Sequence, residues 1–74
     1  MAGDPGHDPL ERLDPEQRRL LELLAEGLSV AAAARRLYVS RRTADRRLAS
    51  ARALLGVRSN AEAVVLARAA ARAT

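Results

Sequence analysis

The sequence predicts an all-α fold, a four-helix bundle with a central helix-turn-helix, and three observations carry this prediction. Residues that favour helix N-termini recur along the chain at Asp14, Ser29, Ser40 and Ser59, and a stretch with apolar residues at helical spacing follows each of them. No stretch alternates apolar and polar residues as a strand does, and β-branched residues are few. The second and third stretches are joined by a short turn, and the third is long and basic, as in a helix-turn-helix.

The first helix is expected over about residues 15–26. Asp14 precedes Pro15, a residue suited to the first helical position, and Gln17 stands where a capping box requires Glu or Gln. Leucines follow at helical spacing, and Gly27 can adopt the left-handed conformation that ends a helix.

The chain before this helix is rich in Gly, Pro and Asp and has no periodicity. We therefore expect residues 1–12 to form a flexible tail and residues 13–73 to form one small domain. Many of its apolar residues are alanines, so the leucines, the valines and Tyr38 must form most of the core.

The next two helices form the expected helix-turn-helix. Ser29 caps a short helix that ends near Leu37. Ser40 caps a longer helix over residues 41–55, which Gly56 ends.

Ser59 opens a fourth helix that reaches about Arg72, with Glu62 in capping-box position. Helical spacing assigns three residues to the core: Ala63, Val64 and Ala67. It leaves three apolar residues near the surface: Val65, Leu66 and Ala69. Exposed apolar residues in a small domain often mark an association site, but an alanine-rich helix surface is the other interpretation.

The composition excludes several classes of function. Cysteine is absent, and the single histidine, His7, lies in the expected tail. Because nucleophilic catalysis and zinc binding lack their usual residues, we expect no enzyme, no metal, no cofactor and no small-molecule ligand. No apolar run approaches the ~20 residues of a membrane span, and no signal-peptide pattern opens the chain. A cytoplasmic protein without a membrane partner is expected.

Charge is distributed unevenly along the chain. Residues 1–27 carry seven acids against three arginines, whereas residues 28–74 carry ten arginines against two acids. The basic part indicates a polyanionic partner such as DNA.

The helix over residues 41–55 has two faces. Its core stripe, at spacings of four, three and four, is Ala44, Leu48, Ala51 and Leu55. The opposite face holds Arg42, Asp45, Arg46, Ala49 and Ala53, flanked by Arg41 and Arg52 on one side and by Thr43 and Ser50 on the other. Such a face can lie in a major groove, where an arginine can pair with guanine, or it can simply be a solvated charged surface.

Asp45 needs its own explanation, because a carboxylate repels phosphate. An ion pair with Arg41 or Arg42 would orient an arginine, and this is the reading we favour. Acceptance of a hydrogen bond from cytosine is the alternative.

Residues 13–67 resemble the DNA-binding domain of LuxR/NarL-type (GerE-like) transcription regulators. The matching pieces, in order and without gaps, are "LLAEGLS", "ARRLYVS", "RRT" and "LLGVRSNAEAV". The resemblance implies base contacts from Asp45, Arg46 and Ala49 and a backbone approach by Thr43, and it places Arg47 where a histidine is common. It also implies a two-fold dimer seam on the fourth helix, at Val65, Leu66 and Arg68, to which we add the neighbouring Ala69.

Three positions depart from that family pattern. Asp45 and Ala31 stand where lysine is usual, and Leu54 stands where a basic residue is common. Nearby arginines compensate for the missing charge: Arg41, Arg42, Arg46, Arg47, Arg52 and Arg58. DNA binding is therefore expected to persist, with a sequence preference that relatives do not define.

The expected function is sequence-specific binding of double-stranded DNA for transcription regulation, as a homodimer on DNA and associated with the nucleoid when bound. RNA polymerase is a further candidate partner. Two alternatives remain: a helix-turn-helix module that docks on an acidic protein partner, and a promoter reader like region four of sigma factors, which has a similar third helix. Residues 59–67 favour the LuxR type, because they fit its additional helix, whereas the sigma domains usually end near the stretch over residues 49–55.

Overall fold

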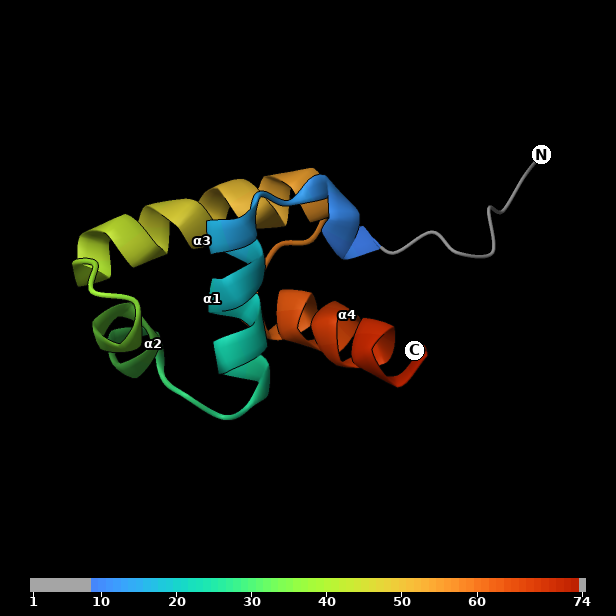
Figure 1. Cartoon of the computed structure of the whole chain (residues 1–74). Coiled ribbons are helices and arrows are strands. Elements are labelled where there is room, and N and C mark those ends of the chain that lie inside the picture. Colours follow the sequence, from blue (N-terminus) through green and yellow to red (C-terminus); the bar gives the residue numbers. More distant parts are fainter. Residues whose placement is uncertain (1–8, 74) are drawn as a thin grey trace.

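The computed structural model describes residues 9–73, and within this range it contains a short 3-10 helix and four α-helices but no strand. The elements in chain order are η1 (Pro9–Arg12), α1 (Pro15–Ala25), α2 (Val30–Arg36), α3 (Arg41–Leu55) and α4 (Asn60–Ala73). In Figure 1, α3 lies across the top of the molecule, and α1 crosses beneath it between α2 and α4. Helices α1 and α3 each pack against all three of the other helices, so these two form the centre of the fold. The all-α, four-helix expectation is confirmed.

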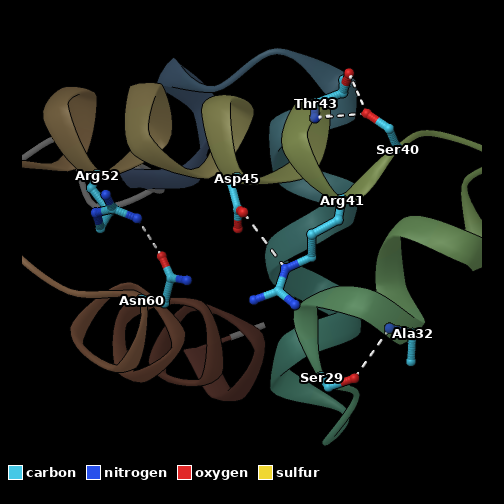
Figure 2. Close-up of polar contacts among 8 residues, drawn as sticks. All are labelled: Ser29, Ala32, Ser40, Arg41, Thr43, Asp45, Arg52 and Asn60. Carbon is cyan, nitrogen blue, oxygen red and sulfur yellow. Dashed lines mark hydrogen bonds and ion pairs between the residues drawn. The ribbon is translucent and has the colours of Figure 1, made fainter.

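The helix starts follow from local capping chemistry. Asp14 Oδ1 accepts from the Gln17 backbone N–H at 2.8 Å, and Gln17 Oε1 accepts from the Asp14 N–H at 3.0 Å, which completes the expected capping box. Ser29 Oγ accepts from the Ala32 N–H at 3.1 Å at the start of α2 (Figure 2). The Ser59–Glu62 pair repeats the reciprocal pattern at α4.

The core is made of leucines on α1 and α3, with alanines where helices come close together. Leu20, Leu21 and Leu23 of α1 and Leu48 of α3 are fully buried. Small residues at the contacts allow close helix packing: Ala33, Ala44, Ala51 and Ala63 have no exposed surface.

Two expectations about the core and the tail are wrong. Tyr38, which was expected to help form the core, is 96% exposed, because it lies in the turn between α2 and α3. Residues 9–12, which were assigned to the flexible tail, form η1, and Leu10 is buried there against α3 and α4. Residues 1–8 of the expected tail, which include His7, lie outside the described residues.

Candidate nucleic-acid interface

Helix α3 divides into a buried and an exposed face at the predicted positions. Ala44, Leu48 and Ala51 have no exposed surface, and Leu55 is half-buried at the end of the stripe. All five residues predicted for the opposite face are exposed: Arg42, Asp45, Arg46, Ala49 and Ala53. Helix α3 therefore presents a basic outer face, and its opposite face is packed in the core.

The N-terminal end of α3 is fixed by Ser40. Its hydroxyl accepts from the Thr43 backbone N–H at 3.0 Å and donates to Thr43 Oγ1 at 3.0 Å (Figure 2). Thr43 is half-buried and engaged in this cap. Its hydroxyl hydrogen can still be donated outward, so the backbone approach expected for Thr43 stays a prediction.

Asp45 forms the intrahelical pair that the sequence favoured. Its Oδ2 lies 3.6 Å from Arg41 Nε, one turn earlier on α3, and both side chains are more than half exposed (Figure 2). Exposed pairs at this spacing contribute only about 0.3–0.5 kcal/mol to stability. The pair places the Arg41 guanidinium beside Asp45 along the helix.

Three arginines that the sequence placed at interfaces are each bonded to another helix of the molecule. Arg47 Nη2 lies 3.1 Å from Glu16 Oε1, which ties α3 to α1. Arg52 Nη1 donates to Asn60 Oδ1 at 2.6 Å, which ties α3 to α4 (Figure 2). The Arg68 guanidinium donates from Nε at 3.2 Å and from Nη2 at 3.1 Å to the carbonyl oxygen of Ala25 at the end of α1.

Other arginines keep their guanidinium groups available. Within residues 9–73, no hydrogen bond or ion pair engages the side chains of Arg42, Arg46 and Arg58, and all three are exposed. Arg35 and Arg36 at the end of α2 are also exposed, so the basic surface extends over the turn into α3. Sequence reasoning confined to α3 missed this extension.

The four residues assigned to a dimer seam differ in exposure, and the seam stays a prediction. Val65 is 63% exposed, and Arg68 and Ala69, three and four residues further along α4, are also exposed, but Leu66 is half-buried. The Arg68 guanidinium forms hydrogen bonds with the Ala25 carbonyl at the end of α1.

Besides this surface, the described part of the chain has few features that could serve as a functional site. It contains no group of three or more His, Cys, Asp or Glu side chains that could hold a metal ion. No helix in it is long and apolar enough to cross a membrane. A groove between α1 and α4 is lined by alanines and by charged residues that include Glu22 and Arg72.

The profile of the family described as ECF sigma factor (Sigma70_ECF) matches residues 4–61, which is most of the chain. No curated protein and no solved structure matches it. The LuxR/NarL resemblance is therefore wrong. The LuxR and sigma families share a helix-turn-helix, and the expected fourth helix was the feature that favoured the LuxR family. Most of α4 lies beyond the residues that match the sigma family, so this helix does not argue against that family.

Proposed function

Because this chain belongs to the ECF sigma factor family, we propose that its α3 reads duplex promoter DNA from the major groove, in the manner of a region-four-like promoter reader. ECF sigma factors bind promoter DNA and RNA polymerase in transcription initiation, and they are not enzymes. The family thus provides the general activity, and the exposed face of α3 provides the residues for it.

The observation that carries this proposal is the outer face of α3. Arg46 lies near its middle with a free guanidinium, and Ala49, one turn further along, leaves room for close approach. A bidentate pair from Arg46 to guanine is the contact that fits this position. Arg42 and Arg58 suit phosphates, and Asp45 acts by aiming Arg41.

Arg47 and Arg52 have a secondary part in the proposal. Each is already bonded to another helix, so a phosphate contact would have to share or replace that bond. We propose that they hold α3 at a fixed angle and add positive potential.

The proposal does not include a homodimer. The main argument for a dimer was the LuxR resemblance, and the guanidinium of Arg68, one of the residues assigned to the dimer seam, already donates to the Ala25 carbonyl. The partner protein of the proposed domain is RNA polymerase, as for its family.

The test is fluorescence anisotropy of a labelled duplex titrated with the chain over a salt series. Each neutralised phosphate adds about 0.9 to the slope of log affinity against log salt, so a slope of about four is expected when four or five of the exposed arginines reach phosphates. Arg46→Ala should abolish the preference between a selected duplex and a scrambled one. Arg72→Ala, which removes the same charge from the α1–α4 groove, is the matched control and should keep that preference.

A chain that bound no duplex even at low salt, alone or with core RNA polymerase, would overturn the proposal. If it still bound the polymerase, the module that docks on a protein partner would be the better description.

A further inference from the structure

Tyr38 has an unfavourable backbone conformation, and its side chain is almost fully exposed. It follows α2 in the turn to α3, and its φ of 59° makes it the single non-glycine residue with a positive φ among residues 9–73. Left-handed backbone is disfavoured for a residue with a Cβ atom. The ring is 96% exposed, so it gains almost no packing in return.

The turn itself does not require tyrosine. The Tyr38 N–H donates to the Arg35 carbonyl at 3.1 Å and the Val39 N–H to the Ala34 carbonyl at 3.0 Å, which is a Schellman motif. Helices α1 and α3 end with the same pair of bonds, and there the left-handed residue is glycine: Gly27 at φ 106° and Gly56 at φ 74°. Glycine at position 38 would close the turn with less strain.

The surroundings of Tyr38 indicate the chemistry of a partner. Arg35 and Arg36 precede it on α2, and Arg41 and Arg42 follow it at the start of α3, all of them exposed. The nearest described acid along the chain, Asp45, is already paired with Arg41. The turn therefore has exposed arginines on both sides of it in the sequence and one large exposed aromatic side chain between them, and it leads into the end of α3 that opens the reading face.

We propose that Tyr38 is a contact to the sugar–phosphate backbone of the duplex, with its ring against a deoxyribose and its hydroxyl donating to a phosphate oxygen. This inference rests on the proposed function, since it assumes that α3 lies on DNA. Phenol hydroxyls bind phosphate in this way, and such contacts position a protein without reading sequence. The strain in the turn is then offset by a contact that exists only in the complex.

The test compares Tyr38→Gly with the unchanged chain in thermal unfolding and in duplex binding. The variant should melt about 4 °C higher, because the left-handed strain is removed. It should bind every duplex about tenfold more weakly, the effect of losing one hydrogen bond to a charged group. Its salt slope should not change, because tyrosine releases no counterion, whereas loss of an arginine contact lowers the slope by about 0.9.

Two further variants separate the parts of the contact. Tyr38→Phe should lose most of the same affinity if the hydroxyl reaches phosphate. Val65→Ala, which trims an exposed apolar side chain on α4, should change neither property. Tyr38 is also the sole aromatic residue in the sequence, so quenching of its emission on adding DNA reports this one position.

Each other outcome overturns the inference in a recognisable way. If the unchanged chain binds DNA and Tyr38→Gly binds equally well, the proposed function stands and the Tyr38 contact does not exist. If Tyr38→Gly loses RNA polymerase but keeps DNA, the ring docks on protein. If the unchanged chain binds no duplex, either alone or with core RNA polymerase, both proposals fail together.

Discussion

At the scale of single residues, the unusual feature is an aspartate on a face that we assign to DNA. The pair of Asp45 with Arg41 is exposed, so it adds little stability. Its carboxylate still lowers the potential of the face next to Arg42 and Arg46. We expect Asp45→Asn to bind a random duplex roughly threefold more tightly at low salt, with the gain vanishing as salt is raised. The melting temperature should hardly move.

Salt-dependent anisotropy measures this effect, and Glu26→Gln is its control, since it removes a similar exposed charge beside the α1–α4 groove. Weaker binding by Asp45→Asn, confined to duplexes with cytosine at one position, would instead make Asp45 a direct base contact.

At the scale of elements, α3 depends on bonds from its neighbours to hold its angle. Arg52 Nη1 and Asn60 Oδ1, 2.6 Å apart, join it to the start of α4. Breaking this half-buried bond should cost about 1 kcal/mol, which lowers the melting temperature by about 4–8 °C in a domain of this size. We expect Arg52→Ala and Asn60→Ala to show similar losses in calorimetry, and the double variant to lose little more than either one.

Duplex binding by the same variants shows whether Arg52 also touches DNA. Asn60→Ala retains the arginine, so below their melting temperatures Arg52→Ala should bind only slightly more weakly than Asn60→Ala, through the lost positive potential, and with an unchanged salt slope. An affinity loss and a smaller salt slope in Arg52→Ala alone would restore it as a phosphate contact.

The elements also show what sequence could and could not predict. Helix starts came out correctly because caps such as Asp14–Gln17 and Ser40–Thr43 are local bonds between residues three apart. The two faces of α3 followed from helical periodicity. By contrast, the bonds of Arg47 and Arg68 join residues far apart in the chain, and no local sequence pattern predicts such bonds. Tyr38 was misplaced because an aromatic residue usually indicates a core, and a left-handed turn seldom holds one.

At the scale of the whole molecule, a small core is completed by a segment that the sequence alone assigned to a flexible tail. Leu10 of η1 is 5% exposed and packs where α3 and α4 meet, and the Leu10 carbonyl accepts from Arg18 Nη2 at 3.1 Å. A domain of this length has only about 5 kcal/mol of stability, and replacing a buried leucine with alanine costs about 2–5 kcal/mol. Leu10→Ala should therefore lower the melting temperature by about 10 °C or more.

Circular dichroism during heating measures this loss, and Leu54→Ala is the matched control because Leu54 is 45% exposed on α3. The same truncation there removes much less buried surface than at Leu10, so its melting temperature should fall far less. Equal melting of both variants would mean that residues 9–12 contribute nothing to the core. A loss confined to Leu10→Ala, with DNA binding lost above the lowered melting temperature and kept below it, would show that η1 supports the surface of α3 through the common core.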